Sequence, residues 1–399
     1  MYKKRKGIFY TVNGNYIQLV ATSLTSIIMN IDEKFPVDII IVSNDITDEN
    51  KQTLYEILDM RKTQVNLLFR MPPDSLELVL GDVSNIFDNV VCWRIFMPYS
   101  LEEYSQLLYL DSDTLIYEGF EEIFGLLPQD KILGVIPDFY FFAINEKNSS
   151  KRGYFNSGVY MINVEKYIQK NSKEELLKNL MENFSEILYV DQTFLNNTFR
   201  GELFYLPLRF NYQKDDNWLN NWAILEAPES SQLFIKERAN IKIRHFIEFG
   251  SHSMPWQHIE VRDQFEEYFW NVWNVLKEYR VKKHRPIKSL KMFLDPKKNE
   301  QIINLLERIC TNFKQINFLD TDIAEGVLLG KYRIYFKSGY DENGGQQNGV
   351  IIFDYLAKRD FQLERFKTNF TTTDARGDLE KGWFGDTLLE IFEYIEQNQ

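Results

Sequence analysis

The sequence lacks several features that mark secreted, membrane-spanning or nucleic-acid-binding proteins. Its only two cysteines, Cys92 and Cys310, make no disulfide framework, which suits the reducing cytosol. No run approaches the roughly 18 apolar residues of a membrane span, and no apolar signal core follows the basic start at residues 2–6. Acidic residues exceed basic ones, and the formal net charge of −12 argues against a general nucleic-acid binder. We therefore expect a cytoplasmic protein without a nucleic-acid partner.

The chain is long enough, and rich enough in apolar residues, for two folded domains. It has 399 residues, of which 44% are hydrophobic, and one core rarely extends over so long a chain. A basic patch at residues 282–286 follows a long helical, aromatic-rich segment, and the pattern changes after it. We expect one domain at residues 1–283 and a smaller α+β domain at residues 284–399, with helices at 300–313 and 386–397 and strands at 332–337 and 349–353. This second domain shows no constellation of metal ligands or nucleophiles, and its role is not predicted.

Short apolar runs alternate with helical patterns over the first domain. Thr47 can cap the helix that follows it, although Asn50 stands where a glutamate or glutamine would complete a capping box. Strands alternating with helices indicate βαβ units, an α/β fold and a mostly parallel sheet. The expected strands lie at residues 7–12, 37–42, 65–69, 107–110, 132–136 and 203–207, and the expected helices at 16–30, 47–61, 173–185 and 260–280.

Two carboxylates follow the apolar run at residues 107–110. In open α/β sheets, ligands bind beyond the carboxyl ends of strands, and in an extended segment residues two apart point to the same side. Asp111 and Asp113 can therefore face one small cation, as oxygen ligands suited to Mg²⁺ or Mn²⁺. The pair alone is a weak signal, because a solvated turn or a haloacid-dehalogenase-type phosphatase motif also contains Asp-x-Asp. Against the phosphatase, the glycine of Asp-x-Asp-Gly-Thr is missing and the pair is not on the first strand.

Further motifs accompany the Asp pair in a fixed order. Together they resemble glycosyltransferase family 8, the retaining sugar-nucleotide-dependent enzymes that include glycogenin and bacterial lipooligosaccharide galactosyltransferases. The resemblance covers roughly residues 7–257 and implies a GT-A-type nucleotide-sugar-binding domain with a mixed, mostly parallel sheet. The motifs are residues 10–16, Arg94, residues 108–113, residues 155–159, Asp191-Gln192, and His245 with a later Pro255-Trp256.

The resemblance implies a role for each matched residue around a metal and a UDP-sugar. Asp111, Asp113 and His245 look like the ligands of a divalent metal, usually Mn²⁺ and alternatively Mg²⁺; an imidazole beside two carboxylates suits Mn²⁺ better than Ca²⁺. The other matches are Thr11, Val12, Asn13 and Tyr16 at the uridine, Arg94 at the sugar or diphosphate, Asn156, Ser157 and Gly158 in a strand and turn lining the sugar, and Asp191 and Gln192 near the anomeric carbon, with Ser112, Gly250 and His252 completing the donor site.

Each of these residues also has an ordinary structural alternative. Tyr16 can pack on its helix, and His245 can be a buried or surface histidine without a ligand. Asp191 can cap the free N–H groups of a helix N-terminus. Arg94 can be a solvated surface charge, and residues 156–158 an ordinary turn.

One residue departs from the pattern of the family. The family commonly has Lys-Pro-Trp after the histidine, and the lysine contacts the departing diphosphate. Met254 takes the place of that lysine here. Either His252 replaces it as a donor or the site relies on the metal.

The resemblance implies transfer of a hexose, from UDP-galactose or UDP-glucose, to a hydroxyl of a glycan or glycoprotein. Asp191 is the nearest candidate nucleophile for a double displacement, but its matched role is hydroxyl binding, and Gln192 is a poor nucleophile. We therefore favour attack on the face that the diphosphate leaves. Two other classes remain: a non-catalytic nucleotide-sugar or glycan-binding partner of another transferase, and a protein that contacts membrane surfaces through its basic, aromatic segment at residues 265–285.

Overall fold

The computed structural model describes residues 5–73, 90–148, 153–183, 189–247, 254–255 and 263–282, together with five strands between residues 316 and 362. Two compact units make up the chain. Unit 1 comprises Met1–Glu248 with Asn271–Leu276, and unit 2 comprises Phe249–Trp270 with Lys277–Gln399. The expected division at residue 283 stays a prediction.

A seven-stranded sheet is the centre of unit 1, with the order β3-β2-β1-β4-β7-β6-β8. The pairs β1–β2, β2–β3, β1–β4 and β6–β8 are parallel, whereas β7 is antiparallel to β4 and β6. This confirms the predicted mixed, mostly parallel sheet. Its strands are β1 (Arg5–Thr11), β2 (Val37–Val42), β3 (Val65–Arg70), β4 (Tyr104–Leu110), β6 (Leu133–Pro137), β7 (Phe155–Asn163) and β8 (Leu203–Tyr205).

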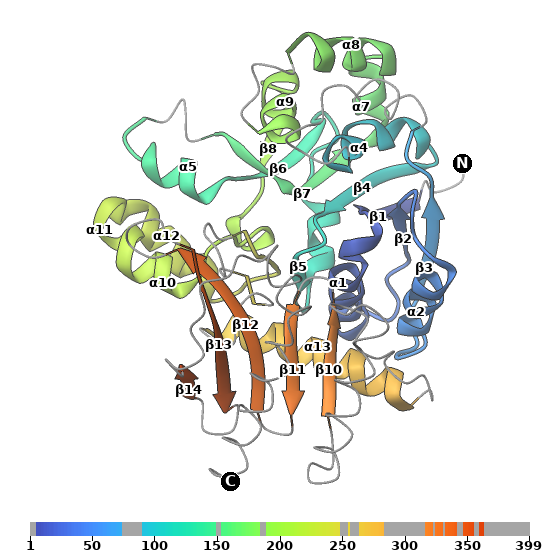
Figure 1. Ribbon diagram of the computed structural model, residues 1–399. Coiled ribbons are helices and arrows are strands. Elements are labelled where there is room, and N and C mark those ends of the chain that lie inside the picture. The colour runs from blue at the N-terminus through green and yellow to red at the C-terminus, as the bar shows by residue number, and fades with distance from the viewer. Residues whose placement is uncertain are drawn as a thin grey trace. The chain divides into compact units, whose positions relative to one another are not determined.

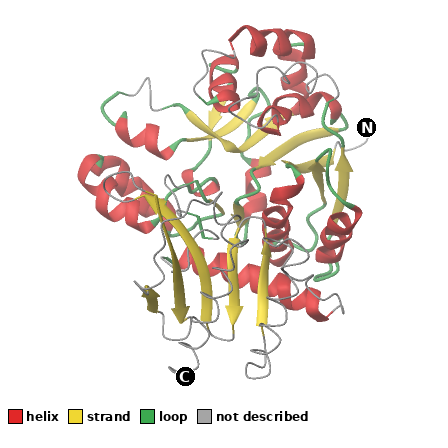
Figure 2. Ribbon diagram, in the orientation of Figure 1, coloured by secondary structure: helices red, strands yellow, loops and turns green. Residues whose placement is uncertain are grey.

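Helices cover the sheet on both sides, as Figures 1 and 2 show. In Figure 1, α4 (Val90–Phe96), α7 (Val164–Lys170), α8 (Lys173–Asn183) and α9 (Val190–Thr198) lie above the sheet. Helices α1 (Ile17–Asn30) and α2 (Asp48–Leu58) lie below it. Because β4 is covered on both faces, residues 107–110 have no exposed surface, which is why this strand reads as a continuous apolar run.

The remaining elements of unit 1 connect these layers. A separate two-stranded sheet joins β5 (Thr114–Ile116) to β9 (Ile243–His245). The others are the short helices η1 (Gly14–Tyr16), η2 (Met97–Ser100), η3 (Phe120–Gly125) and η5 (Leu208–Phe210), the π-helical turn η6 (Leu219–Ala223), and α5 (Phe139–Ile144), α10 (Asp216–Trp218), α11 (Ile224–Glu226) and α12 (Pro228–Arg238).

Besides helices and short strands that were not expected, the structure corrects two predictions about strands. Residues 156–158 do not form a turn after a strand, because β7 begins at Phe155 and runs through them. The expected strand at 203–207 ends at Tyr205, and the chain turns through Pro207 into η5.

In unit 2, the described strands form one antiparallel sheet in chain order. They are β10 (Ile316–Thr321), β11 (Ala324–Leu329), β12 (Tyr332–Tyr340), β13 (Gln346–Asp354) and β14 (Arg359–Gln362). The expected strands at 332–337 and 349–353 lie within β12 and β13, whereas the expected helices at 300–313 and 386–397 lie outside the described residues. The long helix expected at 260–280 is α13 (Gln264–Lys282), and among the described helices none is both long and apolar enough to cross a membrane.

The first turn of α2 supplies a test of the local folding rules. Thr47 accepts a hydrogen bond from the Asn50 N–H through its side chain, as expected for an N-cap. We expect Thr47→Ala to lower the free energy of unfolding in urea by about 1 kcal/mol, because that N–H loses its partner. Thr47→Ser keeps the oxygen and should remain within a few tenths of a kcal/mol of the wild type. Equal losses in the two variants would contradict a capping role.

Candidate active site

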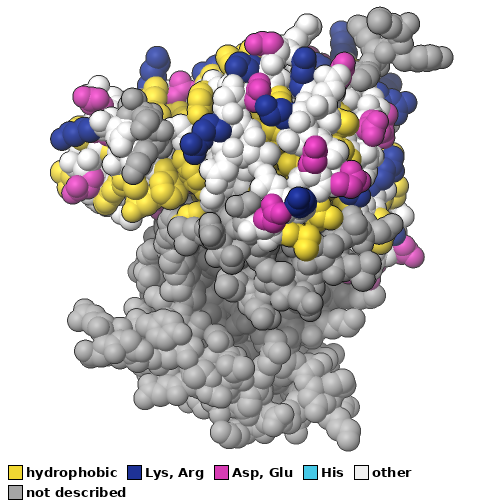
Figure 3. All heavy atoms as spheres, turned by 90° about the horizontal axis from the view of Figure 1, so that it is seen from above, with side chains coloured by type: hydrophobic (Ala, Val, Ile, Leu, Met, Phe, Trp, Pro, Cys, Tyr) yellow, Lys and Arg dark blue, Asp and Glu magenta, His cyan; other side chains and the backbone are white. Residues whose placement is uncertain are grey.

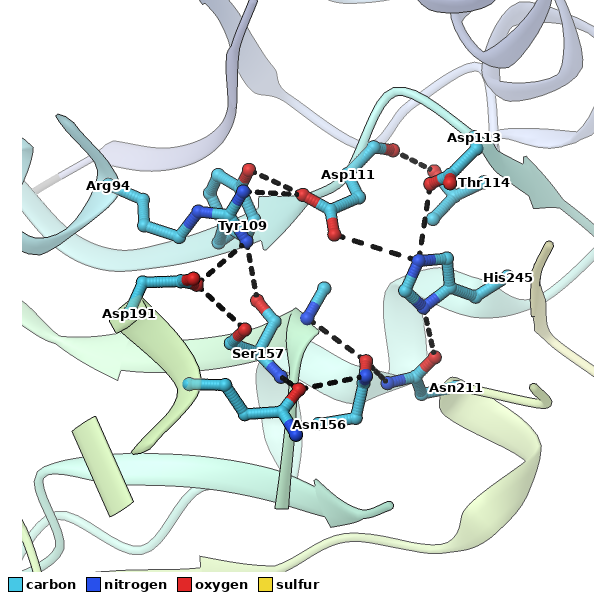
Figure 4. Close-up of polar contacts among 12 residues, drawn as sticks. Arg94, Tyr109, Asp111, Asp113, Thr114, Asn156, Ser157, Asp191, Asn211 and His245 are labelled. Atoms are coloured by element: carbon cyan, nitrogen blue, oxygen red, sulfur yellow. Dashed lines mark hydrogen bonds and ion pairs between the residues drawn. The ribbon is translucent and has the colours of Figure 1, made fainter. Parts of the chain in front are cut away.

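Three potential metal ligands meet where β4 and β9 end. Asp111 directly follows β4, Asp113 lies in the turn before β5, and His245 ends β9. The antiparallel pairing of β5 with β9 places Thr114 opposite His245 and so brings the histidine beside both carboxylates. Its Nε2 atom lies 3.2 Å from Asp113 Oδ1 and 3.6 Å from Asp111 Oδ2, and Figure 4 shows all three side chains pointing to one place.

The donor set at this place fits a divalent cation. One ligand atom from each residue lies within 4.8 Å of the others. Asp113 Oδ1 and His245 Nε2 are buried and have no hydrogen-bond partner, which is costly unless another ligand takes that place. Two carboxylates and one imidazole suit Mn²⁺, and Mg²⁺ is the alternative.

A buried amide network fixes the ring of His245. Its Nδ1 atom lies 3.1 Å from Asn211 Oδ1, so Nδ1 carries the proton and the Nε2 lone pair faces the carboxylates. Asn211 Nδ2 donates to Asn156 Oδ1 at 3.0 Å, and the same oxygen accepts from the Gly158 N–H at 3.0 Å. The position of the histidine therefore depends on the start of β7.

Only a glycine fits at position 158, because the Asp111 and His245 side chains leave no room for a side chain there. A Cβ atom on it would lie 2.6 Å from Asp111 Oδ2 and 2.8 Å from His245 Nδ1. Neither atom can move without breaking the cluster, so any larger residue would displace a metal ligand.

Arg94 joins the metal cluster to Asp191. Its Nη2 atom lies 2.9 Å from Asp111 Oδ1, and its Nη1 atom lies 3.2 Å from Asp191 Oδ2. The guanidinium lies over the Tyr109 ring, 4.4 Å from its centroid, and the Tyr109 hydroxyl donates to Asp111 Oδ1 at 2.7 Å. Burial by itself would lower the pKa of Arg94. The negative charge of Asp111 and the effects of the other neighbours outweigh burial, so the pKa lies well above its ordinary value.

The carboxylate of Asp191 is buried at the start of α9 and is held on one oxygen. Ser157 Oγ donates to its Oδ2 atom at 2.8 Å, and Arg94 contacts the same oxygen. Burial raises the pKa of Asp191, and Arg94 and Ser157 offset only part of this effect. The N-cap of α9 is Tyr189, so Asp191 lies inside the first turn and not at the capping position.

Gln192, like Asp191, accepts hydrogen bonds from the start of β7. Its Oε1 atom accepts from Asn156 Nδ2 at 3.1 Å and from the Ser157 N–H at 3.2 Å. The start of β7 therefore positions the candidate metal ligand His245 on one side and the α9 pair on the other.

The residues matched to the uridine pocket lie at the end of β1 and in η1. Thr11 and Val12 are buried, whereas Tyr16 is 48% exposed and does not pack in the core. The Gly14 N–H donates to Asp45 Oδ1 at 2.8 Å, which fixes this loop. Thr11 Oγ1 is hydrogen-bonded to the Tyr109 hydroxyl at 3.2 Å and so connects this region to Asp111.

Only one of the last three members of the predicted donor site, Ser112, lies within the described residues. Ser112 is half-buried in the turn between the two aspartates. Gly250 and His252 lie outside the described residues, and Met254 is half-buried.

A chain of buried hydroxyl groups supports the turn that carries the two aspartates. Thr114 Oγ1 donates to the Asp111 carbonyl oxygen at 2.8 Å and is bonded to Ser23 Oγ at 3.2 Å. Ser23 Oγ is in turn bonded to the Tyr10 hydroxyl at 2.9 Å. Each hydroxyl has one proton, so Ser23 donates to Thr114 and Tyr10 donates to Ser23. The chain ties the metal turn to α1 and β1.

Sequence reasoning missed the roles of Tyr109, Asn211 and Asp45. A tyrosine in a wholly buried strand needs a hydrogen-bond partner for its hydroxyl. This requirement could have indicated that Tyr109 bonds to a neighbouring polar residue such as Asp111. Asn211 has no exposed surface, but no sequence pattern marks it, because its partners His245 and Asn156 are distant in the chain. Asp45 follows β2 in a polar loop where an aspartate is unremarkable.

Comparison with known proteins identifies the family of the chain. The sequence profile of "Glycosyl transferase family 8" matches residues 7–260, more than half of the chain. The chain belongs to glycosyl transferase family 8. It is 24% identical over 212 residues to the lipopolysaccharide 1,2-glucosyltransferase of Escherichia coli K12, an alignment that covers 51% of this chain and 61% of that protein. It is 23% identical over 283 residues to general stress protein A of Bacillus subtilis, covering 66% and 92% of the two chains.

Solved structures of glycosyltransferases share the fold of this family 8 chain. The galactosyltransferase LgtC, in complex with donor and acceptor sugar analogues, superposes with a TM-score of 0.53 at 20% identity, covering 69% of this chain and 99% of LgtC. The bifunctional glycosyltransferase WbbM gives 0.55 at 17% identity, covering 70% and 52%. These similarities confirm the predicted GT-A-type fold.

The chain of buried hydroxyl groups indicates that the Thr114 hydroxyl holds the turn that carries Asp111 and Asp113. We expect Thr114→Val, which preserves shape but removes the hydroxyl, to weaken Mn²⁺ binding about fivefold, because the Asp111 carbonyl loses its donor. Free Mn²⁺ measured by electron paramagnetic resonance gives the affinity directly.

Two matched variants separate this effect from a general loss of stability. Thr114→Ser keeps the hydroxyl and should bind Mn²⁺ as the wild type does. Thr25→Val removes a buried hydroxyl that bonds only within α1, to the Ala21 carbonyl, and should also leave Mn²⁺ binding unchanged. Wild-type affinity in Thr114→Val would show that the hydroxyl chain does not position the turn.

Proposed function

We propose that this family 8 protein is a metal-dependent, retaining hexosyltransferase. It moves galactose or glucose from a UDP-sugar to a hydroxyl of a glycan or glycoprotein acceptor. The observation that supports this most strongly is the convergence of Asp111, Asp113 and His245, two of whose buried ligand atoms have no hydrogen-bond partner. Without a bound cation, such an arrangement would be costly.

The metal ligands and Arg94 bind different parts of the donor. A divalent cation held by Asp111, Asp113 and His245 supplies Lewis-acid stabilisation of a diphosphate leaving group. Arg94 is a fixed positive charge between Asp111 and Asp191, where it can face the diphosphate and the sugar together. Because the guanidinium is only 7% exposed, its charge is weakly screened and already oriented.

Asp191 and Gln192 suit the sugar end of the donor. Both side chains are buried and are positioned by Ser157 and Asn156, so they present carboxylate and amide groups at fixed places to sugar hydroxyls. Oδ2 of Asp191 is occupied by Arg94 and Ser157, which favours binding over nucleophilic attack. Attack on the face that the leaving group vacates therefore fits this geometry better than a double displacement.

The alternative is a non-catalytic partner that binds the nucleotide-sugar for another transferase. Met254 in place of the family's lysine is the feature that favours it. The metal-ligand cluster and the Arg94 bridge favour the enzyme, because a bound cation and a fixed positive charge would both stabilise a departing diphosphate.

Donor hydrolysis decides between these functions without knowledge of the acceptor. We expect the wild type to release UDP slowly from either UDP-galactose or UDP-glucose, in a reaction that requires Mn²⁺ and stops with a chelator. Asp113→Asn should lower this rate at least a hundredfold, because it removes a ligand charge.

The matched control for that experiment is Asp130→Asn, an exposed aspartate in a turn, which should retain the wild-type rate. If the wild type releases UDP from neither donor and binds UDP equally with and without metal, the enzyme proposal fails and the binding-partner function takes its place.

A further inference from the structure

A row of aromatic side chains connects the α9 end of the candidate site to the surface of unit 1. The ring centroids of its neighbours lie 4.8 to 5.9 Å apart. At its inner end, the Tyr154 hydroxyl is bonded to Thr193 Oγ1 at 2.8 Å, on the residue after Gln192. We call this set the aromatic row: Tyr154, Phe141, Tyr140, Trp222 and Trp218.

The outer half of the row presents ring surface to solvent. Tyr140 is 39% exposed, and Trp218 and Trp222 are half-buried. The two tryptophans stack at 5.0 Å with an interplanar angle of 29°. Rings that served only the core would be covered, as the 0% exposed Phe139 and Phe234 are in the same region.

The backbone under the tryptophans is unusual. Trp222 lies in the π-helical turn Leu219–Ala223, directly after Trp218 at the end of α10. Single π-helical turns are rare and occur frequently at functional sites, because they shift one side chain out of the helical pattern. The local structure is therefore consistent with a ligand-binding surface.

The polar groups beside the tryptophans select the kind of ligand. Asn217, Asn220 and Asn221 are exposed, and each amide can both donate and accept hydrogen bonds. Residues 215–238, which span α10 to α12, include five acidic residues (Asp215, Asp216, Glu226, Glu229 and Glu237) against two basic ones, Lys236 and Arg238, and Arg238 is ion-paired with Asp216. This segment would repel anionic lipid, nucleic acid or a phosphate polymer. Figure 3 shows hydrophobic side chains gathered on the lobe of α5 and α10–α12.

We propose that the aromatic row binds the acceptor as a neutral oligosaccharide chain, with sugar C–H faces on the rings and hydroxyls on the asparagine amides. This inference rests on the proposed function, because the acceptor hydroxyl must reach the donor near Asp191 and Gln192. A monosaccharide covers only the inner rings. A chain of several sugars also reaches Trp222 and Trp218, and each added ring contact strengthens binding about three- to tenfold.

The test compares acceptor lengths. Unlabelled gluco- and galacto-oligosaccharides of one to six sugars are added, and UDP release above the acceptor-free rate is measured. For the wild type, KM should fall with acceptor length. In Trp222→Ala, KM for the hexasaccharide should rise about tenfold while KM for the monosaccharide rises less than twofold, and Trp222→Tyr should restore most of the difference.

Leu225→Ala provides the matched control, since Leu225 is an apolar residue of the same lobe, 74% exposed and outside the row. It should leave every KM unchanged. An equal rise of KM for the monosaccharide and the hexasaccharide in Trp222→Ala, a wild type whose KM does not depend on length, or a loss in Leu225→Ala equal to that in Trp222→Ala would each overturn the proposal.

A second measurement separates this proposal from the proposed function. Tryptophan fluorescence titrated with the hexasaccharides detects binding even if no donor is hydrolysed, and comparison with Trp222→Ala assigns the response within the seven tryptophans of the chain. Binding that Trp222→Ala weakens would support the glycan-binding row in a protein that is not a transferase. Donor hydrolysis without any fluorescence response to oligosaccharide would support the transferase function but contradict glycan binding by the aromatic row.

Discussion

The pairing of β5 with β9 is the contact on which the site depends. It joins residues 114–116 to residues 243–245, and without it His245 would not lie beside Asp111 and Asp113. Because β5 follows the turn at the end of β4 and pairs with β9, the candidate metal cluster lies between the end of the central sheet and this separate two-stranded sheet. This placement favours a metal site with fixed geometry.

Around that cluster, single residues serve two neighbours at once. Arg94 contacts Asp111 and Asp191, and Asn156 contacts Asn211 and Gln192. The metal region and the sugar region therefore share one hydrogen-bonded framework, which Figure 4 shows as a continuous series of contacts. A substitution at the start of β7 should therefore alter side-chain positions in both regions, because the hydrogen bonds of a buried polar network depend on one another.

The sequence allowed the sheet and the matched motif residues to be predicted, because buried parallel strands and Asp-x-Asp leave local patterns. The roles of Asn211 and Gly158 could not be derived from sequence, since each depends on a contact with a residue far away in the chain. Asn211 orients His245 from 34 residues away, and Gly158 is needed only because His245 and Asp111 close over it. The aromatic row is equally hidden, because its members come from three separate segments of the chain.

We propose that Asp111, Asp113 and His245 hold the divalent metal on which the diphosphate binds. Crystals grown with Mn²⁺ and UDP, measured at the manganese absorption edge, test it most directly. We expect one anomalous peak within coordination distance of Asp111, Asp113 and the Nε2 atom of His245, with diphosphate oxygens completing the ligands. UDP bound in the site without a peak there, or with the peak elsewhere, would contradict it.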